Sequence, residues 1–301
     1  MSDIAHANEH PPIPLPATLR IAFIGGGNMA RSLIGGLLAA GPHADQISVA
    51  EPDAAQRERL QTLGALQLGT DNQAAVRDSS IIVLAVKPQV LGAVCTALRP
   101  ALRPEMHSDN SSSDASDQLV VSIAAGVRLQ AMQQWLGDRA IVRCMPNTPA
   151  LLRAGITVLT GNARVSTQQM ALASALLRAV GQCEVVDDEN LLDPVTAISG
   201  SGPAYFFLFM EALTAAGIAQ GLDADQARRL VVATALGAAR MANETPSTLE
   251  ALRVSVTSPN GTTERALQAF EKGDLRSLVA TAALAARDRS IEMADELGLH
   301  R

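Results

Sequence analysis

The sequence predicts an α/β domain built on a parallel sheet, followed by an all-α domain. Short apolar runs alternate with helical patterns in the first two thirds of the chain. This alternation is typical of a parallel sheet with helices on both faces. After about residue 188 the strand-like runs stop, and long Ala- and Leu-rich helices follow. The length of 301 residues suits two domains.

Six apolar runs are expected to form the strands of this sheet. The first ends in glycines and is followed at once by a helical pattern, and a further helix is expected over 57–64. The runs lie at residues 20–25, 47–50, 80–86, 119–126, 139–145 and 155–160.

The expected organisation has a tail, two domains and one insertion. Residues 1–19 are expected to be a disordered tail, because no charged segment followed by an apolar one marks them as a signal peptide. Residues 20–188 form the α/β domain, and residues 189–301 form the helical domain. Residues 103–118 lack periodicity and are rich in Ser and Asp, so they are expected to be a flexible insertion.

The second domain contains long helices that few other elements can cover. The helices expected at 203–221, 223–244 and 274–298 begin with Pro or Asp, and the first and last end at Gly. Several are apolar around most of their circumference, and such helices must be buried. One subunit has too few helices to bury them all, so a homo-oligomer is expected.

Composition excludes several classes of function. The net charge of −6 argues against a nucleic-acid surface. No apolar run reaches membrane-spanning length without interruption, so no membrane partner is expected. The three cysteines lack metal-ligand spacing and are interpreted as buried apolar residues, so no metal site is expected and a cytoplasmic location fits.

The segment IGGGNMA carries a dinucleotide fingerprint. Gly25, Gly27 and Ala30 match the G-x-G-x-x-G/A pattern of a Rossmann-type domain, in which glycines allow a tight turn and close approach to a pyrophosphate. Glu51 ends the second expected strand, where an acid would bind the ribose 2′-hydroxyl. That residue favours NAD over NADP, although a solvated loop carboxylate is the alternative interpretation.

Proton-transferring side chains are scarce. Lys87, Lys272 and Tyr205 are the only residues of their types, and the five histidines lie in a tail, a loop, the insertion or the C-terminus. An alcohol dehydrogenase needs such a group. The scarcity therefore favours a substrate that is already activated for hydride attack, such as a protonated imine.

A turn at SPNGTT raises a separate question about two threonines, Thr262 and Thr263. Ser258-Pro-Asn-Gly261 has turn chemistry and is followed at once by a helical pattern. The simplest explanation is helix capping by a threonine hydroxyl. The alternative is a binding site at the start of the helix.

Six segments, in this order and spacing, resemble the pyrroline-5-carboxylate reductase family. They are FIGGGNMA, AVKPQ, SIAAGV, RCMPNTPA, SGSGPAY and SPNGTT, and the likeness extends from residue 20 to 298. The resemblance implies reduction of 1-pyrroline-5-carboxylate to L-proline with NADPH or NADH. It also implies a Rossmann domain, an all-helical dimerisation domain, and homodimers that often form decamers.

The resemblance also implies roles for individual residues. Thr263 is expected to bond the ring nitrogen of the substrate as the catalytic residue. The other expected substrate contacts are Glu189, Ser258, Gly261 and Thr262. The expected cofactor contacts are Ile24, Gly25, Gly26, Gly27, Asn28, Met29, Glu51, Asn72, Ala85, Val86, Lys87, Pro88, Ile123, Ala124, Ala125 and Ser255.

This chain departs from the family's pattern in two places, and two alternative functions stay open. The family's loop commonly reads Pro-Gly-Gly-Ala-Thr, whereas this chain has Asn260 and Thr262. Glu51 stands where relatives that prefer NADPH often carry a small polar residue, and its charge would repel a 2′-phosphate. The alternatives are a β-hydroxyacid dehydrogenase-like enzyme, whose catalytic lysine could only be Lys272, and a non-catalytic nucleotide-binding regulatory protein.

Overall fold

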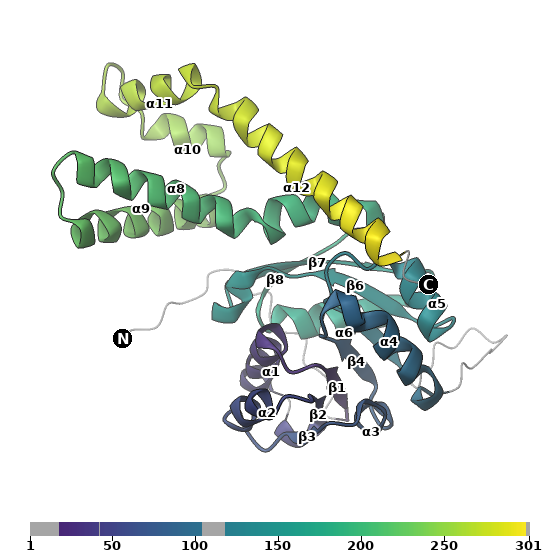
Figure 1. Cartoon of the computed structure of the whole chain (residues 1–301). Helices are drawn as coiled ribbons and strands as arrows, with labels where there is room; N and C mark the ends of the chain where they lie inside the picture. The colour runs from purple at the N-terminus through teal and green to yellow at the C-terminus, as the bar shows by residue number, and fades with distance from the viewer. Residues whose placement is uncertain (1–17, 42, 104–117, 299–301) are drawn as a thin grey trace. The chain divides into compact units, whose positions relative to one another are not determined.

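The computed structural model describes residues 18–41, 43–103 and 118–298 (Figure 1). Most of the expected tail and insertion lies outside these residues. The described chain divides into two compact units. We call residues 18–200 with 286–298 the sheet unit, and residues 201–285 the helical unit.

The sheet unit is built on one eight-stranded sheet. Its order is β3-β2-β1-β4-β5-β6-β7-β8, and every neighbouring pair is parallel except β6 and β7. The strands are β1 Ile21–Ile24, β2 Ile47–Ala50, β3 Gln67–Gly69, β4 Ile81–Leu84, β5 Leu119–Ser122, β6 Ile141–Met145, β7 Gly155–Gly161 and β8 Gly181–Val185.

The structure corrects the expected sheet in two respects. β6 and β7 are antiparallel because only a short 3₁₀ turn, Thr148–Leu152, joins them, and a parallel pair would need a longer crossover. The sequence also failed to predict β3 and β8. Both are edge strands with exposed residues, so neither has the continuous apolar run of a central strand.

Helices cover both faces of the sheet, and the long helices lie close to their expected positions. The sheet unit has α1 Asn28–Ala40, α2 Ala54–Gln61, α3 Asn72–Val76, α4 Pro88–Leu98, α5 Leu129–Leu136, α6 Thr167–Arg178 and α7 Leu192–Val195. The helical unit has α8 Gly202–Ala219, α9 Ala224–Glu244, α10 Leu249–Ser255, α11 Thr262–Lys272 and the first part of α12 Leu275–Gly298.

The core follows from the two-residue alternation of the strands. In β1, Ile21 and Phe23 pack on the face covered by α1 and α6, whereas Ala22 and Ile24 pack on the face covered by α4 and α5. Successive side chains of a strand point to opposite faces, so both sides of the strand must be apolar. This explains why the central strands read as continuous apolar runs.

The two ends of the expected insertion are held together at the sheet. The backbone N–H of Arg103 donates to Gln118 Oε1 at 2.8 Å, and Gln118 Nε2 donates to the carbonyls of Val76 and Ser79. Gln118 is buried. A segment whose ends are fixed in this way can vary in length at little cost to the fold.

The helical unit exposes an unusual amount of apolar surface. Phe206, Phe207 and Leu208 of α8 are each more than 60% exposed, and α9 and α12 expose further large apolar side chains. One helical stretch, Glu189–Ala219, is long and apolar enough to span a membrane by length and composition, and 6% of its most apolar window is buried. Pro203 and a π-helical segment, Thr196–Gly200, interrupt this stretch.

Two adjacent glycines of α1, Gly35 and Gly36, differ in how closely neighbouring atoms approach them. A Cβ added to Gly36 would lie 2.3 Å from the carbonyl oxygen of Ala179, whereas one added to Gly35 would have its nearest neighbour, Leu63 Cδ2, at 4.0 Å. We expect Gly36→Ala to lower the free energy of unfolding by about 1–3 kcal/mol through overpacking. Gly35→Ala should raise it by about 0.5–1 kcal/mol, because alanine is the better helix former.

Urea unfolding and thermal melting of both variants measure this difference. Equal effects of the two substitutions would show that α1 does not approach α6 as closely as the structure describes.

Candidate functional site

The glycine segment forms a tight turn between β1 and α1. Gly25 has a φ of +96°, and a Cβ added to it would lie 2.8 Å from the carbonyl oxygen of Ala85. Gly27 is the N-cap of α1, and no side chain caps the helix there. A Cβ added to Gly27 would have no atom within 4 Å. An uncapped helix start with open space beside it suits a pyrophosphate, so these residues fit a dinucleotide cofactor.

Glu51 holds this turn from the neighbouring strand. The side chain is 9% exposed, and its Oε2 accepts a 2.7 Å hydrogen bond from the N–H of Gly26. Oε1 accepts a 2.8 Å bond from the N–H of Asp53. The carboxylate is therefore a fixed negative charge beside the glycine turn, and the alternative of a solvated loop carboxylate is wrong.

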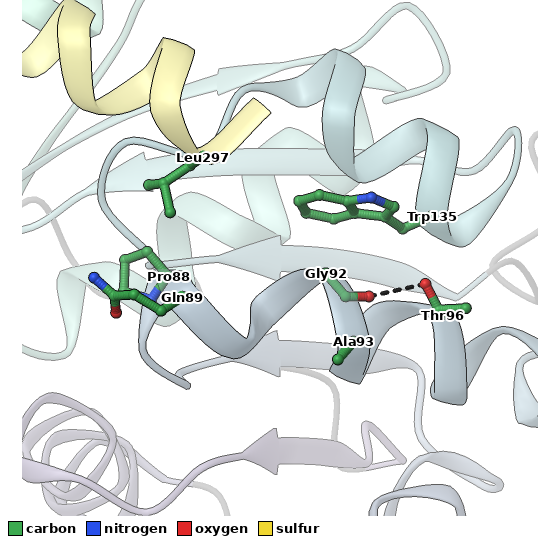
Figure 2. Close-up of a pocket in the computed structure, with 7 residues that line it drawn as sticks. All are labelled: Pro88, Gln89, Gly92, Ala93, Thr96, Trp135 and Leu297. Atoms are coloured by element: carbon green, nitrogen blue, oxygen red, sulfur yellow. Dashed lines mark hydrogen bonds between the residues drawn. The ribbon is translucent and has the colours of Figure 1, made fainter. Parts of the chain in front are cut away.

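Two other predicted segments lie beside this turn. Ala85 follows β4, and its N–H donates to the carbonyl of Ile24 at 2.8 Å. Val86 approaches Gly25, Lys87 is the N-cap of α4, and Pro88 is the first residue of that helix (Figure 2). The structure thus brings 24–29 and 85–88 together at the carboxyl ends of β1 and β4, where open α/β sheets bind ligands.

The remaining cofactor candidates of the sheet unit lie on neighbouring elements. Ile123 follows β5, and its N–H donates to the carbonyl of Leu84 at 3.1 Å, which places 123–125 beside the end of β4. Asn72 is the first residue of α3, whose N-terminus Asp71 caps. The Asn72 side chain is half-buried. The helix α3 contacts β1 and β2.

Glu189 belongs to a partly buried ionic network that the sequence did not reveal. Its Oε1 accepts a 2.7 Å bond from Arg143 Nη1 and a 2.8 Å bond from the N–H of Leu129. Arg143 is almost completely buried in β6. A buried guanidinium needs a partner, so this pair fixes the position of Glu189. The only available signal was an arginine inside the apolar run RAIVRCM.

A second ion pair anchors the end of α12 in the sheet unit. Arg128 Nη2 lies 2.8 Å from Asp193 Oδ2, and Ser290 Oγ donates to Asp193 Oδ1 at 2.8 Å. Asp193 is 2% exposed. The pair joins α7, α12 and the start of α5 within one unit.

The SPNGTT turn ends in a helix start with no side-chain cap. The N–H of Gly261 donates to the carbonyl of Ser258, and Asn260 has a left-handed φ of 59°. Gly261 is the N-cap of α11, and Thr262 and Thr263 are its first two residues. Capping by a threonine hydroxyl is therefore wrong. The first N–H groups of α11 have no side-chain acceptor at the cap and suit an anionic group.

The predicted residues fall into two groups, one in each unit. Ser255 ends α10, and its Oγ donates to the carbonyl of Leu252 at 2.8 Å. It belongs to the helical unit with 258–263, whereas the other predicted residues belong to the sheet unit.

The three cysteines are free thiols, and the pKa of each is raised, whereas a reactive thiol has a lowered pKa. Burial raises the pKa of Cys95 to about 12 and that of Cys183 to about 12. Burial also raises the pKa of Cys144. Thiols with raised pKa values stay protonated near neutral pH and are poor nucleophiles and metal ligands.

Comparison with protein families identifies matches in both parts of the chain. A family described as pyrroline-5-carboxylate reductase dimerisation matches residues 189–293. A family described as NADP oxidoreductase, coenzyme F420-dependent, matches residues 20–126.

Individual relatives match over nearly the whole chain. A pyrroline-5-carboxylate reductase of Pseudomonas aeruginosa is 50% identical over 94% of this chain and 99% of its own. The structure of a pyrroline-5-carboxylate reductase from Coxiella burnetii is similar, with a TM-score of 0.84, 41% identity, and coverage of 92% and 99% of the two chains. The Plasmodium falciparum enzyme with NADP bound has a TM-score of 0.77 at 27% identity, covering 92% and 99%.

The position of Glu51 predicts an effect on cofactor preference. Glu51→Gln removes the negative charge but keeps one oxygen acceptor for the glycine turn. We expect it to raise the ratio of kcat/KM with NADPH to kcat/KM with NADH about tenfold, equivalent to about 1.4 kcal/mol, since a carboxylate repels a 2′-phosphate. Glu51→Ser should shift the ratio in the same direction.

Asp53→Asn is the matched control for this measurement. It removes a charge from the same turn, but Asp53 is exposed and caps α2 through the N–H groups of Ala55 and Gln56. The ratio should change much less. An unchanged ratio in Glu51→Gln, or an equal change in Asp53→Asn, would show that Glu51 does not face the ribose.

Proposed function

The chain belongs to the pyrroline-5-carboxylate reductase family, and we propose that the uncapped start of α11 holds its substrate. The enzyme reduces 1-pyrroline-5-carboxylate to L-proline with NAD(P)H, the last step of proline biosynthesis. The observation that carries the proposal is Gly261 at the N-cap of α11, with no side chain bonded there. The free N–H groups suit the substrate carboxylate.

Thr263 is placed for the ring nitrogen in this proposal. The reduced nicotinamide supplies a hydride to the carbon of the protonated imine. As positive charge leaves the nitrogen, the Thr263 hydroxyl keeps a hydrogen bond to it and holds the ring in line. Such a bond raises kcat only if it is stronger in the transition state than in the bound substrate. Thr262 contributes through its backbone N–H, and Ser258 and Gly261 shape the turn.

Glu189 is proposed as a further substrate contact. Its carboxylate is fixed by Arg143 and by the N–H of Leu129, so it offers a rigid acceptor beside the end of the sheet. A rigid acceptor loses little conformational entropy when it binds a ligand.

The cofactor contacts are proposed on the carboxyl edge of the sheet. The glycine turn with the N-terminus of α1 would bind the pyrophosphate, and Asn72 the adenosine ribose or its phosphate. Residues 85–88 would border the cofactor and 123–125 the nicotinamide. Ser255 would add a contact from the helical unit. The open space beside Gly27 supports this assignment.

A homodimer is proposed to cover the apolar helices of the helical unit. The match to a dimerisation family over residues 189–293 supports it, and so do the exposed side chains of α8. The same burial would account for the apolar stretch Glu189–Ala219 without a membrane. Assembly of dimers into a decamer and a cytoplasmic location belong to the same proposal, and the unpaired cysteines agree with a reducing compartment.

Steady-state kinetics tests the role of Thr263. Wild-type enzyme should oxidise NADH or NADPH only when the imine is added. Thr263→Ala should lower kcat about tenfold to a hundredfold, as expected for a positioned hydrogen bond worth about 1.4–2.8 kcal/mol. Thr263→Ser keeps the hydroxyl and should lose less.

Thr262→Ala is the matched control, because it removes a neighbouring hydroxyl from the same helix turn. Its kcat should stay near that of wild type. Since Gly261 is the N-cap, Thr263→Ala should not lose the stability of about 1 kcal/mol that a cap provides. Wild-type kcat in Thr263→Ala would exclude the catalytic role.

Sedimentation velocity tests the dimer. The wild-type protein should have at least twice the mass of the 31.4 kDa chain. Phe209 packs within the helical unit against Phe270, whereas Phe207 is 64% exposed. Phe207→Asp should shift the protein towards monomer, because a charge in an apolar interface is costly. Gln130→Asp adds the same charge to an exposed site on α5 and should leave the mass unchanged. A monomeric wild type would overturn the proposal.

A further inference from the structure

Arg57 of α2 reaches back to the loop that follows β2. We propose that Arg57 is a specificity-determining residue, which binds the 2′-phosphate of NADPH and offsets the preference for NADH that Glu51 imposes. The inference rests on the proposed cofactor edge and adds a residue to it. The sequence motifs assign Arg57 no role, and all residues that carry the argument belong to the sheet unit.

The guanidinium of Arg57 is bonded to two backbone carbonyls. Its Nη1 donates hydrogen bonds of 2.7 Å to the carbonyl oxygens of Glu51 and Pro52. These two residues follow directly after β2, which ends at Ala50. The bonds therefore fix the guanidinium at the carboxyl end of β2. In a Rossmann-type domain this is the place where an acidic residue or an arginine recognises the 2′ position of the adenosine ribose.

The packing of Leu60 shows which face of α2 is turned towards the glycine turn. A Cβ added to Gly26 would lie 2.6 Å from Leu60 Cδ1. Residues three apart are neighbours on the surface of a helix, so Arg57 and Leu60 share this face. Leu60 is buried and Arg57 half-buried, whereas Arg59 is exposed. Arg57 therefore extends from the face of α2 that packs against the turn proposed to bind the pyrophosphate.

The charge of Arg57 has no carboxylate partner among the residues that the structure describes. Both oxygens of Glu51 accept from the backbone N–H groups of Gly26 and Asp53, and Asp53 itself caps α2. Within the same described ranges, Nε and Nη2 of Arg57 have no acceptor. A phosphate offers acceptors that match the planar fork of a guanidinium. Arg57 therefore keeps donors and a positive charge for such a group.

Arg57 and Glu51 act in opposite directions on the two cofactors. NADPH differs from NADH by one phosphate on the adenosine ribose. The Glu51 carboxylate repels this phosphate and suits the free hydroxyl of NADH, whereas the Arg57 guanidinium attracts the phosphate. The pair therefore lets the enzyme use both cofactors, and the ratio between them depends on both residues.

Arg57→Gln is the central variant, because glutamine loses the charge but keeps an N–H donor for the carbonyls of Glu51 and Pro52. We expect the ratio of kcat/KM with NADPH to kcat/KM with NADH to fall about tenfold, through a higher KM for NADPH. The constants with NADH should stay within about twofold of wild type. Arg57→Lys keeps a charge without the planar fork and should lose less.

Arg59→Gln is the matched control, because it removes the same charge from an exposed site of the same helix. Its ratio should stay within about twofold of wild type, since solvent screens a distant exposed charge.

Calorimetric binding of adenosine 2′,5′-bisphosphate and of 5′-AMP gives a readout without turnover. Arg57→Gln should weaken the bisphosphate about tenfold and leave the Kd of 5′-AMP unchanged, because only the bisphosphate carries the 2′ group. Added salt should weaken the bisphosphate more in wild type than in Arg57→Gln.

An unchanged ratio in Arg57→Gln, or an equal change in Arg59→Gln, would overturn the proposal. An equal loss with both cofactors would also contradict it, because that result indicates only a structural role for the bonds to Glu51 and Pro52. Arg57→Ala provides the same comparison if Arg57→Gln does not fold. Failure of the proposed cofactor edge is distinguishable, because Glu51→Gln would then leave the ratio unchanged as well.

Discussion

The proposed site depends on the backbone N–H groups at the starts of two helices, α1 and α11, which no side chain caps. Asp53, Asp71, Ser166, Asp223 and Thr248 cap the starts of their helices with side-chain oxygens. Several other helices start without a side-chain bond at the cap, and among these α-helices of the described residues only α1 and α11 have glycine, Gly27 and Gly261, as the N-cap. Each start therefore offers donors and a positive dipole end to an anion. In the proposed function, anionic groups of the cofactor and of the substrate occupy these positions.

Several polar residues of the sheet unit mainly hold charge and backbone in place. Both carboxylate oxygens of Glu51 accept hydrogen bonds from backbone N–H groups, and Arg143 holds Glu189 by a partly buried ion pair. Asn147 ties the π-helical segment to the end of β6. None of these groups needs to transfer a proton, which agrees with the scarcity of acid–base side chains. Reduction of an imine that is already protonated requires the protein to align the reactants and to complement their charges, and it depends less on proton transfer.

The sequence predicted most of the fold, because the central strands are buried on both faces and therefore read as apolar runs. β3 and β8 were missed, since edge strands have exposed residues and no such run. The reversal of β7 depends on the shortness of the connection Thr148–Leu152, and the apolar residues of that connection do not indicate the direction of the strand. In the site, glycine spacing predicted the turn after β1, and motif order predicted the residues of the SPNGTT turn. The ion pair of Arg143 with Glu189 joins residues 46 positions apart, and neither local pattern nor spacing indicates such a contact.

We propose that the start of α11 binds the substrate and presents Thr263 to its nitrogen, and a crystal structure of the enzyme with NADH and L-proline measures the distances that decide this. We expect the proline carboxylate within hydrogen-bond distance of the N–H groups at the start of α11, and the ring nitrogen within about 3.2 Å of Thr263 Oγ1. Proline bound with its carboxylate elsewhere, or with Thr263 directed away from its nitrogen, would show that the start of α11 does not bind the substrate in this way.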